Sequence, residues 1–280
     1  ELSARMGATE KLAPSAIEYR RMGQPSKPTV ILIPGNTETC SSFGPIMERL
    51  AEQFDVIAYS QRGHGRTPAL GMNYSSEQLA ADLLGLMDFL GVRKAHLVGH
   101  SLGARTALRA AALAGDRVLS ITVEDFPATP VSFDSRLHSA SLASQLMELP
   151  EIFESKGQAV SEVGAILDAD WTDRLVSQFG MELDRRRFKF SVSLPVYLLY
   201  GSQAGSENQA PLLAQIHPPI LVVGADPQRG GLLTAEHIQK WRDNKVQVVP
   251  VLSAGHYVHR DSPKEFTDTL IPFLSRVPSI

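Results

Sequence analysis

The sequence predicts an α/β fold with a mostly parallel central sheet, helices on both faces and an inserted helical cap. Short Val- and Ile-rich runs end in glycine or proline turns, and helical stretches separate them, which is typical of a parallel sheet. This alternation stops at about Phe126 and resumes after Pro218, and helical stretches dominate between them. We therefore predict a core domain from residues 1–126 and 218–280. Residues 127–217 are predicted to form a cap over the carboxyl ends of the strands.

The first core elements follow from composition and spacing. Thr29–Ile33 and Val56–Tyr59 are apolar, β-branched runs that end in glycine-containing turns, so both are predicted strands. The clearest helix is Ser75–Leu90, where leucines recur at helical spacing. Ser75 and Gln78 have the spacing of a capping box at its start.

The same alternation of apolar strand-like runs and helical stretches predicts the rest of the core. Ala95–Gly99 is a strand that leads into a helical run, Ala104–Ala111. The later core strands are predicted at Val118–Val123, Ile220–Gly224 and Val246–Val251. The later core helices are predicted from Thr234 and at Pro263–Leu274. In the cap we predict helices at Arg136–Leu149 and Gly164–Phe179. Most apolar cap residues are expected to pack on the body, including Leu142, Leu146, Met147, Phe153, Trp171, Leu175 and Phe179.

Composition and charge exclude several classes of protein. With 43% hydrophobic and 20% charged residues, the 280-residue chain is expected to be a soluble globular protein. The net charge of −3 gives no reason to expect nucleic acid or an anionic membrane as a partner. The single cysteine, Cys40, excludes an internal disulfide and fits a reducing compartment, so we expect a cytoplasmic location. The chain begins at Glu1 rather than Met, which leaves a removed leader open.

The central motif is Gly-His-Ser-Leu-Gly at residues 99–103, between a predicted strand and a predicted helix. In this context the serine sits on a tight, strained turn, and the glycines let strand and helix approach each other. Ser101 is therefore the candidate nucleophile. A serine hydroxyl needs a base to take its proton, and histidine has a suitable pKa.

His256 follows the last predicted strand and is the first choice for that base, with His259 as its local rival. The imidazole in turn needs a carboxylate to orient it. Asp226 follows the preceding strand and is the favoured acid. Asp125, directly after the strand that precedes the cap, is the alternative acid.

An acyl-transfer site also needs two N–H donors for the oxyanion. The backbone N–H of Leu102, directly after the nucleophile, is one candidate, and the backbone N–H of Asn36 in the Pro-Gly-Asn-Thr loop is the other. Cys40 lies near this loop, and we expect it to be a small buried apolar group.

With these motifs in this order, the chain resembles the α/β-hydrolase superfamily over nearly its whole length. The loop at residues 34–37 matches the oxyanion loop, and residues 56–67 resemble the family's Asp-x-Arg-Gly-x-Gly-x-Ser stretch. The order Ser101, Asp226, His256 is that of the family's triad. Residues 224–231 resemble the acid loop of a bacterial branch of esterases and C–C hydrolases.

The chain also departs from the pattern. Pro34 stands where the family commonly has His, and Ser60 stands where Asp is usual. The serine at position 101 argues against haloalkane dehalogenases and epoxide hydrolases, which begin their chemistry with an aspartate.

These observations predict a carboxylesterase-like serine hydrolase acting on a small or medium ester or lactone, with Ser101, His256 and Asp226 as its triad. Two alternatives stay open: a C–C hydrolase cleaving a β-diketone-type bond, and a triad-bearing small-molecule receptor with slow turnover. No cofactor or metal is expected, and the partner is a small-molecule substrate. The sequence does not predict the oligomeric state.

Overall fold

The computed structural model describes residues 12–131, 140–184 and 186–278. Within these residues, seven strands form the central sheet in the order β1-β3-β2-β4-β5-β9-β10. The strands are β1 (Tyr19–Met22), β2 (Thr29–Ile33), β3 (Asp55–Tyr59), β4 (Ala95–His100), β5 (Val118–Glu124), β9 (Ile220–Ala225) and β10 (Gln247–Val251). Strand β1 pairs antiparallel with β3, and the other neighbours are parallel. The predicted strands are all present, and the antiparallel edge strand β1 is an addition to the prediction.

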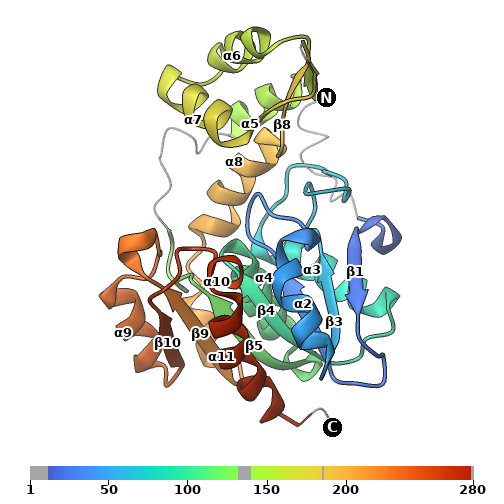
Figure 1. Cartoon of the computed structure of the whole chain (residues 1–280), viewed down its shortest axis with the longest axis vertical. Helices are drawn as coiled ribbons and strands as arrows, with labels where there is room; N and C mark the ends of the chain where they lie inside the picture. Colours follow the sequence, from blue (N-terminus) through green and yellow to red (C-terminus); the bar gives the residue numbers. More distant parts are fainter. Residues whose placement is uncertain (1–11, 132–139, 185, 279–280) are drawn as a thin grey trace.

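Helices cover both faces of this sheet (Figure 1). One face packs against α2 (Gly44–Ala51), α10 (Val258–Asp261) and α11 (Pro263–Ser275). The other face packs against α3 (Ser76–Phe89), α4 (Leu102–Leu113) and α9 (Ala235–Asp243). The predicted leucine stripe of α3 joins this second core, with Leu79, Leu83 and Leu86 buried and Leu90 packed against them. The sheet is thereby enclosed, as the hydrophobic runs of its strands require.

The start of α3 differs in detail from the predicted capping box. The Ser75 hydroxyl accepts a hydrogen bond from the backbone N–H of Gln78, as expected. The Gln78 side chain, however, donates to Asp82, and the backbone N–H of Ser75 donates to Asn73 instead. Both backbone N–H groups of the expected capping box still have acceptors, but these come from two residues, Ser75 for Gln78 and Asn73 for Ser75.

The segment between β5 and β9 forms a lobe above the sheet (Figure 1). It contains α5 (Ala140–Met147), α6 (Lys156–Gly164), α7 (Ala169–Phe179) and α8 (Leu194–Ser202). It also contains a small antiparallel sheet that the sequence did not predict, built from β6 (Ile152–Phe153), β7 (Gly180–Glu182) and β8 (Phe188–Phe190). The predicted helix at Gly164–Phe179 is wrong in its first turn, because α6 ends where that helix was expected to begin. Residues 136–139 of the other predicted helix lie outside the described residues.

The apolar residues of this lobe pack mainly on one another rather than on the body. Of the residues expected to pack, Leu146, Phe153, Leu175 and Phe179 are buried in the lobe's own core, and Met147 is exposed. The side chains of Leu142 and Trp171 lie outside the described residues.

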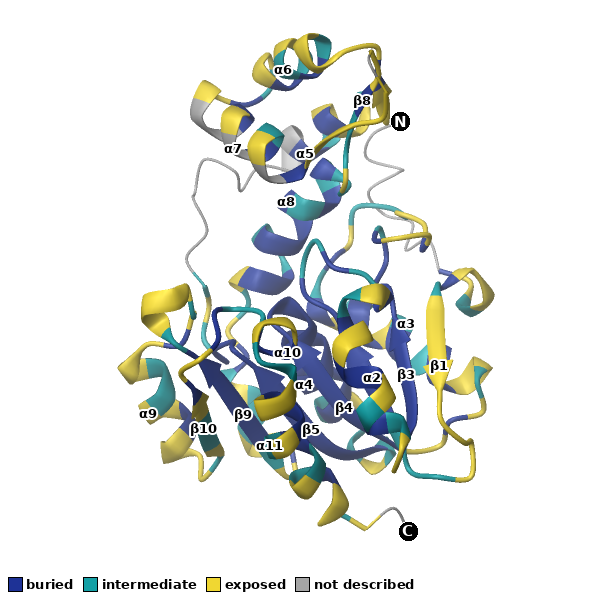
Figure 2. Cartoon of the chain, viewed as in Figure 1, coloured by how far each residue is buried: buried dark blue, intermediate teal, exposed yellow. Residues whose placement is uncertain are grey.

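Helix α8 connects the two parts, and Figure 2 shows it mostly buried, with some intermediate positions. Its Leu194 and Leu198 belong to the core of the lobe, whereas Val196, Leu199 and Tyr200 belong to the main core. The boundaries at residues 127 and 217 therefore stay an interpretation, with α8 shared between the two parts.

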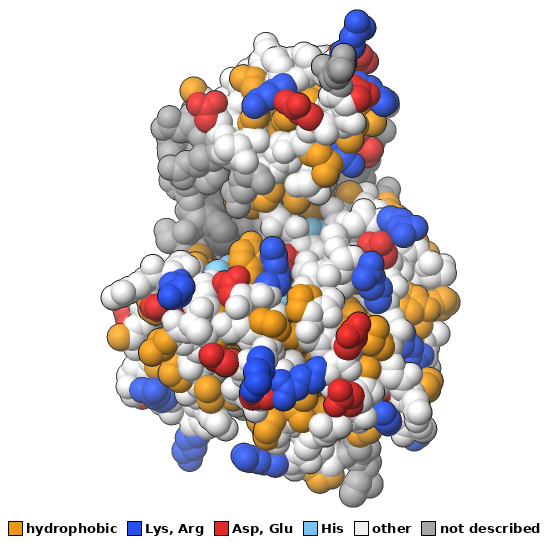
Figure 3. All heavy atoms as spheres, in the orientation of Figure 1, with side chains coloured by type: hydrophobic (Ala, Val, Ile, Leu, Met, Phe, Trp, Pro, Cys, Tyr) orange, Lys and Arg blue, Asp and Glu red, His pale blue; other side chains and the backbone are white. Residues whose placement is uncertain are grey.

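The surface shows no strong segregation of charge on the face drawn in Figure 3, where acidic and basic side chains are interspersed. Among the described helices, none combines the length and the apolar character needed to cross a bilayer.

Candidate active site

The turn between β4 and α4 holds Ser101 in a strained conformation, with φ 50° and ψ −123°. A Cβ on Gly99 would lie 2.5 Å from the Cα of Ala104, and a Cβ on Gly103 would lie 2.2 Å from the carbonyl oxygen of Ile33. Both glycines are therefore required for the close approach of strand, helix and neighbouring loop. A non-glycine residue persists in such a conformation only where the surroundings enforce it, and this is common at functional sites. The geometry is that of the predicted nucleophile turn.

The loop after β2 lies directly against this serine. A Cβ on Gly35 would lie 3.0 Å from the Cβ of Ser101, a tight contact, so glycine at this position favours the close approach of the loop backbone. The N–H of Gly35 donates to Glu38, and the N–H of Thr37 donates to His64. The intervening N–H of Asn36 has no hydrogen-bond partner within the described part of the chain. This leaves it available as a donor for a bound ligand.

Leu102 offers the second donor. It is the first residue of α4, so its N–H has no carbonyl one turn earlier in the helix. The helix dipole adds partial positive charge at the same end. The N–H groups of Asn36 and Leu102 thus have the properties expected of an oxyanion hole.

His64 supports the oxyanion loop as a neutral ring. Its Nδ1 lies 3.1 Å from the carbonyl oxygen of Arg62, to which it donates, and its Nε2 accepts the N–H of Thr37 at 3.0 Å. Burial lowers the pKa of His64 to about 4, against which its bond to Arg62 and the charge of Glu38 act more weakly. The Asn36 side chain donates to the carbonyl of Tyr197 in α8 and so ties the loop to the lobe.

The structure brings His256 together with Asp125. His256 Nδ1 lies 2.7 Å from Asp125 Oδ2, and the Asp125 side chain is fully buried. The same carboxylate accepts the backbone N–H groups of Ala225 and Leu232 at 3.0 and 2.9 Å. Three donors therefore hold the Asp125 side chain in a fixed orientation, and its contact with Nδ1 orients the His256 ring with Nε2 turned away from Asp125.

Asp226, the acid favoured from the sequence, is wrong as the partner of His256. Its carboxylate accepts the backbone N–H of Gln228 at 2.9 Å and caps a short 3-10 helix, η7 (Pro227–Arg229). Its other oxygen lies 3.7 Å from Arg229 at the surface. The loop that carries Asp226 uses its backbone, through Ala225, to bind Asp125 rather than sending its own side chain to His256.

The strand order contains the signal that would have identified Asp125. Strand β5 is the direct neighbour of β4, and Ser101 is linked to it by a hydrogen bond from its N–H to the carbonyl of Glu124. Asp125 is the first residue after β5 and has φ 47°, a conformation that non-glycine residues seldom adopt. An acidic residue directly after the neighbouring strand is thus as well placed as one after the next strand along.

The other sequence candidates occupy different places. His259, the rival base, is fully buried, and its Nδ1 donates to Glu124. Cys40 is buried and its backbone N–H donates to Ser60, the residue that stands in place of the usual Asp. Neither residue lies in the position expected of a base or nucleophile.

Two buried acidic residues next to the candidate site were not identified from the sequence: Glu38 and Glu124. Both are buried against histidines next to the site. A glutamate that ends an apolar strand and another just after a Pro-Gly loop were the available signals. The atoms of Glu38, His100 and His259 that could bind a metal all lie within 4.8 Å of one another. The absence of a metal or cofactor stays a prediction.

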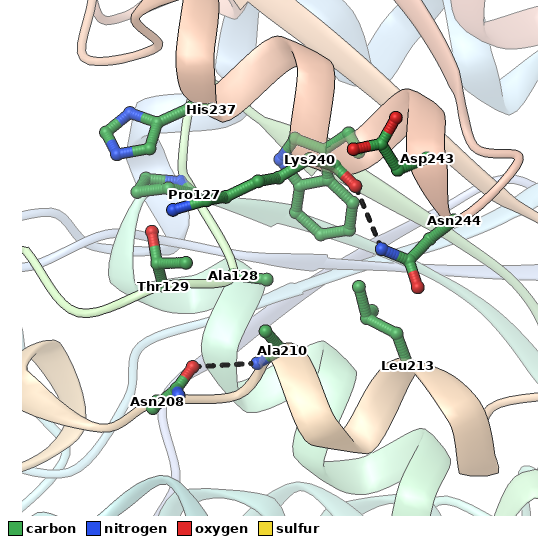
Figure 4. Close-up of a pocket in the computed structure, with 11 residues that line it drawn as sticks. Pro127, Ala128, Thr129, Asn208, Ala210, Leu213, His237, Lys240, Asp243 and Asn244 are labelled. Carbon is green, nitrogen blue, oxygen red and sulfur yellow. Dashed lines mark hydrogen bonds between the residues drawn. The ribbon is translucent and has the colours of Figure 1, made fainter.

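A separate cavity of about 290 Å³ lies between α9, the segment that follows β5 and the 3-10 helix η6 (Ala210–Gln215). Figure 4 shows Lys240 of α9 and Asn244, the residue after this helix, on one side, and Leu213 and Ala210 of η6 on the other. None of the candidate catalytic residues lines it. This cavity is therefore not a guide to the chemistry of the candidate site.

Comparison with known proteins gives an independent result. The sequence profile described as "Alpha/beta hydrolase family" matches residues 30–269. The 2-(acetamidomethylene)succinate hydrolase of Mesorhizobium japonicum is 38% identical over 127 residues, which is 44% of this chain and 45% of that protein. This alignment thus spans less than half of either sequence.

Other matches extend over most of the chain. The N-formylmaleamate deformylase of Pseudomonas putida is 28% identical, with 88% of each chain covered. Esterase YbfF of Escherichia coli is 24% identical, covering 84% of this chain and 88% of that one. A crystal structure of E-2-(acetamidomethylene)succinate hydrolase superposes with a TM-score of 0.69 at 26% identity, covering 94% of this chain and 97% of that chain.

Proposed function

Because the chain belongs to the alpha/beta hydrolase family, we propose that it is a serine hydrolase that cleaves a small or medium carboxylic ester or lactone. Ser101 is the nucleophile, His256 the base and Asp125 the acid of its triad. The N–H groups of Asn36 and Leu102 form the oxyanion hole.

The chemistry follows from these roles. His256 Nε2 takes the proton of the Ser101 hydroxyl as the oxygen attacks the substrate carbonyl, and Asp125 stabilises the imidazolium that forms. The two N–H groups stabilise the negative charge on the tetrahedral oxygen. His256 then returns the proton to the leaving alcohol, and a water molecule, activated by the same histidine, releases the acyl group from Ser101.

One observation carries the proposal: His256 Nδ1 lies 2.7 Å from the buried carboxylate of Asp125, which accepts three hydrogen bonds in all. Such a pair fixes the tautomer of the histidine so that its Nε2 can act as a base. It supports the proposal because Asp125 and the strained Ser101 follow adjacent strands of the sheet.

A second substrate class is favoured by the relatives. Two of the named enzymes act, by their names, on an acetamido compound and an N-formyl compound. An N-acyl substrate would use the same serine, histidine and oxyanion hole, because only the leaving group changes. We therefore include small amides beside esters and lactones in the test.

The test combines labelling with kinetics. Purified protein is treated with a fluorophosphonate probe and mapped by peptide mass spectrometry, and the expected site of the label is Ser101. Hydrolysis of p-nitrophenyl acetate, a γ-lactone and an N-aryl formamide is then compared for the wild type, Ser101→Ala and Ser41→Ala, an exposed serine of the same loop region. We expect Ser101→Ala to lose activity by about 10³-fold or more and Ser41→Ala to retain it. Equal turnover by the wild type and Ser101→Ala would overturn the proposal.

A further inference from the structure

Four ionisable side chains form a buried cluster beside the candidate active site: Glu38, His100, Glu124 and His259. None of them is more than 3% exposed. Burial of an isolated charge is strongly unfavourable, so such groups persist only where they neutralise and hydrogen-bond one another. Their arrangement therefore needs a reason beyond packing.

Each member of the cluster is attached to a different part of the proposed catalytic apparatus. His100 and Glu124 directly precede Ser101 and Asp125 in the sequence. Glu38 accepts the N–H of Gly35 at 2.9 Å and so holds the oxyanion loop.

The base loop is held from two sides. His100 Nε2 lies 3.0 Å from the carbonyl oxygen of His256, to which it donates. Glu124 accepts both the backbone N–H of His259, at 2.8 Å, and its ring Nδ1–H, at 2.9 Å. The cluster thus cross-links the four segments that supply the nucleophile, the acid, the base and an oxyanion donor.

The contacts of His100 define its protonation. Its Nε2 faces a carbonyl oxygen, which can only accept, so Nε2 carries a proton. Its Nδ1 lies 2.5 Å from Glu38 Oε2, an oxygen that already accepts the Gly35 N–H. A second proton on the ring makes this a charge-assisted bond between an imidazolium and a carboxylate. The rings of His256, Tyr257 and His259 complete its surroundings.

His259 has the same character. Its Nδ1 donates to Glu124, and its Nε2 points to Glu38 Oε1 at 3.5 Å. A bare Nε2 would leave two electron-rich atoms facing each other in a buried site, whereas a protonated Nε2 attracts the carboxylate. The rings of Phe43 and Phe266 also lie beside His259, with centroid distances of 4.6 and 6.4 Å. Two imidazolium ions and two carboxylates give the cluster a net charge of zero.

The electrostatics agree with this assignment. Burial opposes charge on each group, but it is outweighed: the charges of Glu38 and Glu124 raise the pKa of His100, and the charge and hydrogen bond of Glu124 raise the pKa of His259 to about 9. In the same way, His100 and His259 overcome the effect of burial on Glu38 and hold its pKa well below the ordinary value.

A metal ion is the rival occupant of this cluster, and one distance argues against it. Two ligand atoms bound to a tetrahedral ion at about 2.1 Å are about 3.4 Å apart. His100 Nδ1 and Glu38 Oε2 are 2.5 Å apart, which is within hydrogen-bond distance and shorter than the separation of two ligands on one ion.

We propose that Glu38, His100, Glu124 and His259 form a charge-neutral positioning unit that holds the oxyanion loop, Ser101, Asp125 and His256 in their catalytic arrangement. The inference rests on the proposed function, because it assigns these four residues an effect on catalysis through Ser101 and His256. It places none of them in contact with the substrate.

The first test measures protonation and does not need activity. Protein with ¹⁵N-labelled histidine, carrying Ser101→Ala, is examined by NMR at pH 7.5 to 8, and metal content is determined by elemental analysis. We expect two histidines with both ring nitrogens protonated, and loss of one of these imidazolium signals in His100→Gln. Neutral rings at both positions, or one metal ion per chain that is lost in His100→Gln, would overturn the proposal.

The second test separates positioning from folding. Glu38→Gln keeps an oxygen for the Gly35 N–H but leaves the charge of His100 uncompensated. We expect kcat to fall by about 10- to 100-fold with KM changed less than about threefold. Adding His100→Gln removes the uncompensated charge, so the double variant should lose no more than Glu38→Gln alone.

The matched control is His96→Gln, which alters another buried histidine of β4 that binds Ser120 outside the cluster. It should lower stability without lowering kcat in the folded protein. A wild-type kcat for Glu38→Gln, with Ser101→Ala inactive, would overturn the positioning unit and leave the proposed function intact. Full activity of Ser101→Ala would instead overturn the proposed function.

Discussion

His100 and Glu124 face each other in the register of the parallel strands β4 and β5. The residues that follow them, Ser101 and Asp125, therefore leave the sheet from adjacent strands at the same level. Both have a positive φ, 50° and 47°, so both chains turn sharply where the strands end. A single register thus positions the nucleophile and the acid together, and their preceding residues supply half of the buried charge cluster.

Replacing Asp125 with Asn should inactivate the enzyme, because Asn cannot stabilise the imidazolium of His256 and favours the wrong tautomer. We expect kcat to fall by about 10³- to 10⁴-fold. The matched variant is Asp226→Asn, in the residue whose side chain caps η7, and it should stay within about threefold of the wild type. Hydrolysis of p-nitrophenyl acetate measures both. A large loss in Asp226→Asn with an active Asp125→Asn would restore the acid favoured from the sequence.

These two aspartates show which parts of the fold and of the candidate site could be predicted from the sequence. Six of the seven strands of the central sheet were predicted because each is a compact apolar run, and Ser101 and His256 were proposed because each follows such a run at the expected edge. The choice between Asp125 and Asp226 depended on the direction of a side chain after the strand ends. That direction is set by a positive φ at Asp125 and by N–H groups of Ala225 and Leu232, which lie about 100 residues away.

The lobe was harder to predict for a different reason. Strands β6, β7 and β8 are two or three residues long, so they carry no period that distinguishes them from loops. Glu38 and Glu124 were missed because a buried charge is recognisable only by its partner, and their partners are distant in the sequence.

Gly103→Ala should destabilise the protein, because the new methyl would lie 2.2 Å from the carbonyl oxygen of Ile33 and 2.6 Å from that of Pro34. Backbone atoms cannot move aside as a flexible side chain can. We expect a loss of about 2–3 kcal/mol, seen as a fall in Tm of roughly 5–10 °C in thermal unfolding. Gly44→Ala is the matched control, because nothing lies within 4 Å of its Cβ position, at the start of α2. An unchanged Tm for Gly103→Ala would contradict the close packing of the nucleophile turn.

Thermal stability should be highest near pH 6.5 and should fall on both sides. Burial lowers the pKa of His64 to about 4. As the pH falls from about 6.5 towards 4, the unfolded chain therefore binds a proton at this histidine that the folded protein does not bind, and the folded state loses stability. The pKa of His259 is raised to about 9, despite burial, by Glu124 and Glu38. Its contribution is fully present below pH 6.5 and is lost as the pH rises through 9.

The two sides of this profile can be separated by substitution. His64→Gln should reduce the slope on the acid side of a plot of Tm against pH without abolishing it, because burial also lowers the pKa of His96 to about 4. His259→Gln should reduce the slope on the alkaline side, where the raised pKa of His100 still contributes. Each variant also loses hydrogen bonds and lowers the maximum. Differential scanning fluorimetry from pH 4 to 9.5 measures both. If His259→Gln altered the acid side instead, the charge assigned to this ring would be wrong.

Asp82→Asn should destabilise the turn that supports the oxyanion loop. Arg62 forms two hydrogen bonds to Asp82, at 2.5 and 2.7 Å, and the two side chains are only 2% and 8% exposed. Loss of the carboxylate leaves a buried guanidinium without its counter-ion, which costs about 3–5 kcal/mol and should lower Tm by roughly 6–15 °C.

The matched control is Asp268→Asn, which removes the partner of Arg49 from a pair that is 41% exposed on both sides and should leave Tm almost unchanged. Because Arg62 accepts the bond from His64 through its carbonyl, Asp82→Asn should also inactivate the enzyme at temperatures below its Tm. Equal stability of the two variants would show that burial of the Arg62 pair contributes nothing to holding this turn.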